Sequence, residues 1–147
     1  MNNNFEPVMA ALFSCLQAGG GSSGTEFLTT GRRLIPWSQV PEQPAMFLRR
    51  VGVTDEGHDP FTTTTLECEV WIYCNDGQDQ DAIPDSGLTA LEQMIRDSIA
   101  PGISDGDGRF TLGGLAYWCR IEGKSIVSPG DLDGQAIARI PIRITLP

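Results

Sequence analysis

The chain has 147 residues, which suffices for one domain with a single hydrophobic core over residues 1–147. Ten basic residues against 19 acidic residues give a formal net charge of -9 and a pI near 4.4. This excess of negative charge argues against a protein that wraps nucleic acid or binds an anionic membrane through basic side chains.

The sequence also argues against a membrane span, a leader and a disulfide framework. No apolar run approaches the roughly 20 residues that cross a bilayer, and no basic region precedes the first apolar stretch. The four cysteines form no CxxC motif, which argues against a zinc or redox centre. Cys68 and Cys74 would lie about 20 Å apart in one strand, too far for a disulfide. We therefore expect a cytoplasmic location and free, buried thiols.

The first half of the chain predicts one helix and three strands. Apolar residues at helical spacing predict a helix over residues 8–18, which ends at the glycine-rich loop 19–24. Strands are expected over residues 26–37, 45–54 and 61–74. The third strand alternates apolar with polar or aromatic side chains, so one of its faces should be buried.

The second half predicts one more helix and two more strands. An acidic loop over residues 75–85 precedes a helix over 86–100, and strands follow over 112–127 and 135–146. Pro141 in the last strand suggests a sheet edge or a bulge. The predicted fold class is therefore α+β, with an antiparallel sheet of about five strands packed with two helices.

Motifs that would indicate catalysis fail on their context. The loop at residues 19–24 matches GxGxxG and GxSxG literally, but it follows a helix instead of a strand. His58 is the only histidine, which excludes catalytic triads and three-histidine metal sites. The acidic loops lack the glutamate that completes a calcium-binding loop. We expect no enzyme activity, no cofactor and no built metal site.

Two groups of residues are candidates for contacts between proteins. Glu67, Glu69, Trp71 and Tyr73 share one face of the predicted strand, where aromatic side chains beside carboxylates indicate either an interface or half-buried packing. The paired arginines are the second group, and they could bridge to acids of a neighbouring subunit or form ordinary surface pairs. These arginines are Arg32, Arg33, Arg49 and Arg50.

Three parts of the chain carry a resemblance to a known family. The first is the helix at residues 8–18 followed by RRLIPWSQV (residues 32–40) and QPAMFL (residues 43–48). The second is TLGGL (residues 111–115) with IEGK (residues 121–124), and the third is the ending DGQAIARIPIRI (residues 133–144). Together they resemble the tail terminator proteins, also called tail completion proteins, of long-tailed bacteriophages.

The resemblance implies a structural protein of the virion. Subunits of that family are α+β domains that assemble into a ring, commonly hexameric, at the head-proximal end of the tail. The ring caps the tail tube, ends its polymerisation and joins the tail to the connector proteins of the head and neck. The implied partners are other copies of the chain, the tail tube protein and neck proteins, with assembly in the host bacterial cytoplasm. DNA passes through the lumen without sequence-specific binding, and no catalysis is involved.

Acidic residues of two loops are candidates for the lining of such a lumen, because like charge would repel DNA phosphates. The alternative interpretation of these acids is plain solubility. The candidates are Asp76, Asp79, Asp81, Asp105 and Asp107.

Two other functions remain open. The chain could be another neck component, such as a head-completion or head–tail adaptor protein. It could also be a small ligand- or metal-binding domain that uses its acidic loops.

Overall fold

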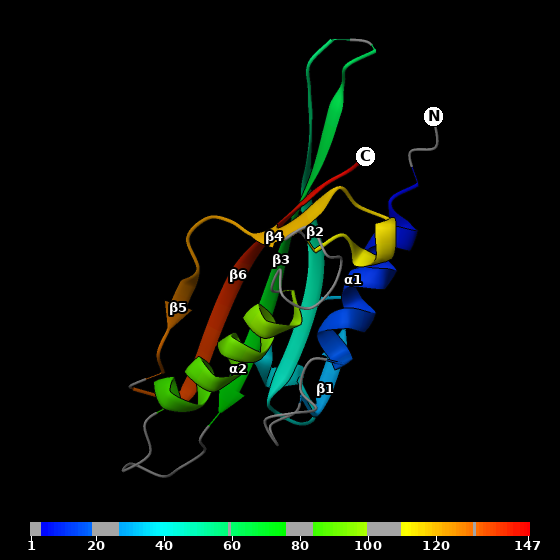
Figure 1. Ribbon diagram of the computed structural model, residues 1–147. Coiled ribbons are helices and arrows are strands. Elements are labelled where there is room, and N and C mark those ends of the chain that lie inside the picture. The colour runs from blue at the N-terminus through cyan, green and yellow to red at the C-terminus, as the bar shows by residue number, and fades with distance from the viewer. Residues whose placement is uncertain (1–3, 19–26, 59, 76–83, 100–109, 131) are drawn as a thin grey trace.

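A computed structural model describes residues 4–18, 27–58, 60–75, 84–99, 110–130 and 132–147. Two helices and one mixed six-stranded sheet form an α+β fold (Figure 1). The helices and strands in chain order are α1 (Glu6–Ala18), β1 (Thr29–Gly31), β2 (Ala45–Glu56), β3 (Thr63–Asn75), α2 (Pro84–Ser98), β4 (Trp118–Ile121), β5 (Ile126–Ser128) and β6 (Gln135–Thr145). Two short 3-10 helices lie at Trp37–Gln39 and Leu112–Gly114.

The sheet is ordered β1-β2-β3-β6-β4, and β5 also pairs with β6. Only β1 and β2 run parallel, while the other pairs are antiparallel. The two longest ladders join β3 to β2 and to β6, so these three strands form the centre of the sheet.

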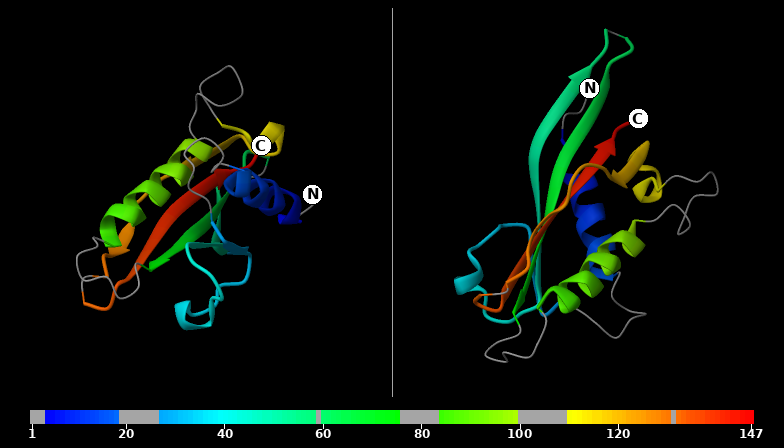
Figure 2. Two further views of the ribbon diagram at one scale, coloured as in Figure 1. Left: turned by 90° about the horizontal axis from the view of Figure 1, so that it is seen from below. Right: turned by 90° about the vertical axis from the view of Figure 1, so that its left-hand side faces the viewer.

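Both helices lie on the same face of the sheet, and the main hydrophobic core lies between the two layers (Figure 2). Every second residue of β3 and β6 points into this core because successive side chains of a strand face opposite sides. The fully buried side chains of this layer include Leu12, Leu16, Met46, Leu48, Leu66, Ile72, Leu88, Leu91, Ile95, Ile140, Ile142 and Ile144.

The described residues cover the opposite face of the sheet at one end. There the segment between β1 and β2 packs Leu34, Ile35 and Val40 against Phe47 and Tyr73. Beyond this small second core, no helix covers this face within the part of the chain that the structure describes. We call the uncovered part of this sheet the open face.

Both predicted helices and three of the predicted strands are confirmed with small shifts of their ends. The two α-helices, β2, β3 and β6 all overlap the residues expected for them. The four thiols are free, and only Cys15 is not fully buried.

The predicted strand over residues 26–37 is wrong in length. Among the described residues of this range, only Thr29–Gly31 form a strand, and this strand is parallel to β2. Prolines at positions 36, 41 and 44 withhold backbone N–H donors, so the following segment cannot extend the ladder. The sheet is therefore mixed instead of purely antiparallel.

The predicted strand over residues 112–127 is also wrong, because three elements replace it. Gly113 and Gly114 have positive φ and close a 3-10 turn before β4. Gly123 has a φ of 117° and separates β4 from β5. These glycines explain why the sheet has six strands instead of about five.

Pro141 lies in an interior strand, at the point where its neighbouring edge strand is broken. Its carbonyl oxygen accepts a hydrogen bond from the Glu122 backbone N–H on the β4–β5 side of β6. Because the N and O of one residue point to the same side of a strand, the missing N–H donor also faces the break between β4 and β5. Its ring fills the space beside Gly123, where an added Cβ would lie 3.2 Å from Pro141 Cγ. An interior proline is tolerated here because its side of the ladder is already interrupted.

A two-stranded hairpin formed by β2 and β3 projects beyond the rest of the sheet (Figures 1 and 2). We call residues 53–64 the hairpin arm. The ladder between β2 and β3 continues to the Glu56–Thr63 pair, whereas the ladder between β3 and β6 ends at the Thr65–Thr145 pair. The arm is therefore hydrogen-bonded within itself but lies outside both hydrophobic cores.

Candidate protein-protein interface

Charged side chains from β2, β3, β4 and β6, together with Glu122 just after β4, form a continuous array on the open face. Each arginine of this array lies next to at least one glutamate, with N–O distances between 2.8 and 3.8 Å. Four arginines against three glutamates leave one net positive charge. The array consists of Arg49, Glu67, Glu69, Arg120, Glu122, Arg139 and Arg143.

The register of the sheet produces this alternation. Glu69 on β3 lies between Arg49 of β2 at 3.8 Å and Arg139 of β6 at 3.7 Å. Arg143 lies 3.6 Å from Glu67 and 3.8 Å from Glu122. Because cross-strand neighbours of opposite charge face each other, all but one positive charge of the array is balanced within one subunit.

The array contributes little to folding but presents an ordered polar surface. Exposed pairs of this kind stabilise a fold by about 0–1 kcal/mol each. Two tryptophan rings flank the arginines, with Arg120 4.1 Å from the Trp118 ring centre and Arg139 5.2 Å from that of Trp71. Such stacking holds the guanidinium groups in fixed positions.

Trp71 combines burial with an unpaired donor. Its indole Nε1 is buried and has no hydrogen-bond partner among the described residues. The ring packs edge-on against Tyr73, with centroids 6.4 Å apart. Trp71 is therefore half-buried at the border between the small second core and the array.

The structure separates the four predicted residues of β3. Glu67, Glu69 and Trp71 lie on the open face, whereas Tyr73 is buried under the segment that precedes β2. The Tyr73 hydroxyl donates a hydrogen bond to the Ile35 carbonyl oxygen at 2.7 Å, and burial raises the pKa of this phenol. Tyr73 is thus a core residue in the subunit.

The four predicted arginines also lie in different environments. Arg49 belongs to the array, and Arg32 forms a two-pronged ion pair with Glu6, whose second contact is 3.2 Å long. This hydrogen-bonded partner lowers the pKa of the exposed Glu6 carboxyl. Arg50 stacks on Phe5 at 5.3 Å, and Arg33 is exposed. The partners of Arg32 and Arg49 in these contacts come from the same chain.

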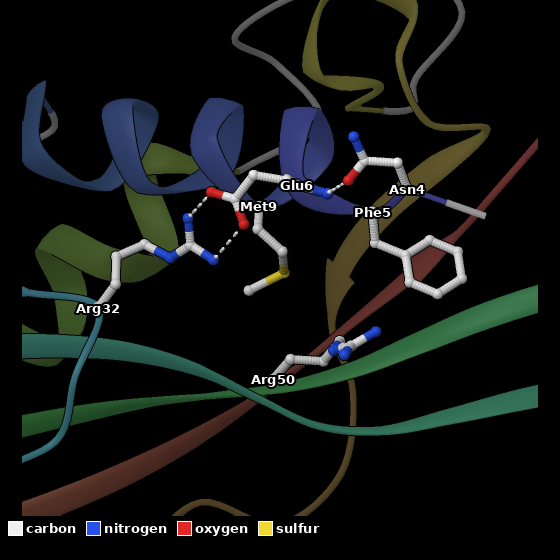
Figure 3. Close-up of a pocket in the computed structure, with 6 residues that line it drawn as sticks. All are labelled: Asn4, Phe5, Glu6, Met9, Arg32 and Arg50. Carbon is white, nitrogen blue, oxygen red and sulfur yellow. Dashed lines mark hydrogen bonds and ion pairs between the residues drawn. The ribbon is translucent and has the colours of Figure 1, made fainter. Parts of the chain in front are cut away.

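Arg32 and Arg50 also line a cleft of about 260 Å³ beside the N-terminus of α1 (Figure 3). Figure 3 shows the Arg32–Glu6 pair on one side of the cleft and the Arg50 guanidinium beside the Phe5 ring. Asn4 caps the helix through its side-chain oxygen, which accepts a hydrogen bond from the Glu6 backbone N–H at 3.1 Å. The lining residues are Asn4, Phe5, Glu6, Met9, Arg32 and Arg50.

The hairpin arm exposes apolar side chains that have no core to join. Phe61 near its tip is 82% exposed and Val53 on β2 is 40% exposed. Val51, at the bulge where the arm begins, is also exposed. Exposed apolar groups on a projecting element are typical of protein contact surfaces.

The predicted lumen acids Asp76, Asp79, Asp81, Asp105 and Asp107 lie outside the described residues. Within the described ranges, no group of three or more histidine, cysteine or acidic residues is arranged to hold a metal ion. None of the helices in these ranges has the length and apolar character to cross a bilayer.

The β4 and β6 members of the array were not among the residues predicted for an interface, although the sequence of β6 alternates polar with apolar residues. Arg139 and Arg143 alternate with isoleucine and alanine in β6, which predicts a polar face. Their glutamate partners on β3 become apparent only once the register of the sheet is known.

Comparison with known proteins assigns no family to this chain. No protein-family model matches it, and no curated protein shows significant sequence similarity to it.

Proposed function

We propose that this chain is a structural virion protein that forms a ring on the tail tube of a long-tailed bacteriophage. The ring, with six subunits by the family resemblance, caps the tube, ends its polymerisation and joins the tail to the head and neck. It acts at the head-proximal end of the tail and is assembled in the host bacterial cytoplasm. The proposal involves no catalytic step and no cofactor.

The hairpin arm is the observation that carries this proposal. A two-stranded hairpin without a packed face is only marginally stable in water. The arm nevertheless extends to the Glu56–Thr63 pair and ends near an almost fully exposed Phe61. An element of this kind is explained by a protein partner that covers it.

The two faces of the sheet support an assembly function in different ways. Helices α1 and α2 close one face, so the open face and the arm remain for contacts. The array supplies charged groups that are already paired and oriented, which lowers the entropic cost of using them in an interface.

The net charge supports a duct through which DNA slides. Six copies of a chain with a charge of -9 carry about -54 before pairing and screening. A ring with this charge repels phosphate and favours passage over binding. The proposed partners are other copies of the chain, the tail tube protein and the connector proteins of the neck.

Electron microscopy of phage tails assembled with and without this chain tests the proposal. With the intact chain, we expect tubes of uniform length that carry a ring at the head-proximal end. Without it, overlong tubes indicate a terminator, whereas normal tubes that fail to join heads indicate a head–tail adaptor. Tubes and joining that are unchanged without the chain would contradict both functions.

A variant with a shortened arm tests directly whether the hairpin arm is needed for ring formation. Replacing residues 55–64 by Asn-Gly closes the hairpin at the Thr54–Thr65 pair with a two-residue turn. We expect a folded subunit that no longer forms rings. Leu132→Ser, which removes an exposed apolar side chain outside the arm, is the matched control and should form rings normally.

A small metal- or ligand-binding domain is the competing function. Stabilisation of the isolated chain against heat by millimolar calcium or magnesium would favour it.

A further inference from the structure

The cleft beside α1 holds an arginine that has no acidic partner among the described residues. Arg50 contacts the Phe5 ring, but it forms no ion pair with any described residue. Arg32, on the other side of the cleft, is occupied by Glu6. The two arginines and one glutamate give the cleft one net positive charge in a chain whose overall charge is -9.

The N-terminus of α1 adds to the positive electrostatic potential of the cleft. Backbone N–H groups of the first turn give a helix N-terminus a partial positive charge that favours an anion. Asn4 and Glu6 lie at this end of α1, beside Arg50 (Figure 3). The cleft therefore offers a place for a carboxylate next to the apolar surface of Phe5.

One face of the hairpin arm carries the complementary chemistry. Val53 pairs with Leu66 and Asp55 pairs with Thr64, so Val53 and Asp55 lie two residues apart on the same face. The Thr64 hydroxyl donates a hydrogen bond to Asp55 at 2.6 Å and holds its side chain in place. An apolar group and a carboxylate about 7 Å apart along a strand match a cleft whose Phe5 and Arg50 lie 5.3 Å apart.

The arm cannot reach the cleft of its own subunit. Asp55 follows Arg50 by five residues in the same strand, which places it about 16 Å further along an extended chain. Beyond the bulge after Arg50, the ladder with β3 holds Gly52–Glu56 in an extended strand, so this segment cannot fold back onto its root. Asp55 can therefore meet such a cleft only in another copy.

We propose that the Val53–Asp55 face of the arm in one copy docks in the Phe5–Arg50 cleft of the next copy. The Asp55 carboxylate pairs with the Arg50 guanidinium, and Val53 covers the Phe5 ring. Because the arm and the cleft are different surfaces, each copy gives one arm to one neighbour and receives one from another, and this head-to-tail contact forms a ring when the rotation between successive copies closes. This inference rests on the proposed function and identifies the contact that joins its subunits.

A charge swap in the full-length chain tests the docking. We expect Asp55→Lys and Arg50→Glu each to weaken self-association about tenfold or more, because each opposes two like charges. The double variant restores the opposite pair with reversed signs and should assemble within about threefold of the unmodified chain. Light scattering across a concentration series measures the association, and circular dichroism checks that each variant is folded.

Glu56→Lys is the matched control. It makes the same change of charge one residue away, but Glu56 lies on the opposite face of the arm. We expect it to change association less than about threefold. Equal weakening by the two arm variants would show that net charge matters instead of a specific contact, and would overturn the docking.

A cysteine pair gives a second measurement that does not depend on charge. With Asp55→Cys and Arg50→Cys in the same chain, a short bismaleimide cross-linker, which spans the gap that is too wide for a direct disulfide, should link different copies into covalent oligomers. The pair Glu56→Cys and Arg50→Cys should leave the chain unlinked. Absence of links in the first pair overturns the docking.

The tests separate failure of the docking from failure of the ring. Rings on tail tubes that form equally well with Asp55→Lys would overturn the docking and leave the proposed function intact. An unmodified chain that stays monomeric, both alone and on tail tubes, would overturn both.

Discussion

The two halves of the β2–β3 ladder share one hydrogen-bonding pattern but differ in what covers them. In the inner half, Ala45–Leu48 of β2 are all buried, with both faces of the sheet covered. In the outer half, beyond the bulge between Arg50 and Gly52 that shifts the register by one residue, the arm stays antiparallel with most of its side chains exposed. The comparison shows that backbone pairing sets the shape of both halves, whereas side-chain packing distinguishes the core from the arm.

Truncation of one side chain in each half should separate them most clearly. Leu48 is fully buried, so Leu48→Ala should lower the free energy of unfolding by about 2–5 kcal/mol. Val53→Ala in the arm should change it by less than about 0.5 kcal/mol. Urea denaturation of the monomeric chain measures both, and similar losses would mean that the arm is packed in the free subunit.

A glycine between β4 and β5 allows a similar comparison at the edge of the sheet, beside Pro141. Gly123→Ala should cost about 2 kcal/mol, because its φ is 117° and the new Cβ would lie 3.2 Å from Pro141 Cγ. Gly113→Ala is the control, since its φ is also positive but no atom lies within 4 Å of an added Cβ. If both variants lose the same stability, as judged by their thermal unfolding, the contact with Pro141 has no effect.

High pH should lower the stability of the packed core, where the buried thiols lie, and should leave the arm unaffected. Burial raises the pKa of the Cys68 thiol from 9.0 to about 12, and it raises the pKa of Cys119 further. Above pH 9 the unfolded chain releases protons that the folded chain retains, so stability should fall as the pH rises towards 12. Tyr73 adds to this loss above its ordinary pKa of 10.0.

Denaturation between pH 8 and pH 11 measures this dependence. Cys68→Ala should flatten the pH profile between pH 9 and pH 11, whatever its effect at neutral pH. A free energy of unfolding that stays constant over this range would show that the thiols are more accessible than their burial indicates.

The array should give the smallest effect on folding. Glu69→Gln removes the carboxylate shared by Arg49 and Arg139, and we expect a loss of about 1 kcal/mol or less. The loss should shrink further in 1 M salt, because exposed pairs are screened. A salt-independent loss of several kcal/mol in chemical denaturation would mean that the array holds the sheet together.

Much of the fold was predictable because its signals are local. Helical spacing indicated α1, and strict alternation indicated β3 together with the face on which Glu67 and Glu69 lie. The predicted strands over residues 45–54 and 61–74 match β2 and β3, which form the hairpin. The exposure of its outer half was not predictable, because it depends on which other elements pack nearby.

The errors arose where pairing between distant segments decides the structure. A three-residue strand such as β1 exists because it pairs with β2, and its own sequence carries no signal for a parallel partner. Tyr73 continues the polar-aromatic alternation of β3, yet the segment around Ile35 covers it. The ion pairs of the array likewise depend on the register between β3 and β6, which single-strand patterns do not specify.

The positions of the tryptophans give the molecule built-in optical reporters. None of the three tryptophans of the chain belongs to α1 or α2: Trp71 and Trp118 lie on the open face, and Trp37 begins the 3-10 helix in the segment between β1 and β2. Trp37 and Trp118 are partly exposed to water, whereas the indole N–H of Trp71 is dry. Burial of this face by a partner would therefore shift the emission of the exposed rings to shorter wavelength, so intrinsic fluorescence can follow contacts at the sheet without an added label.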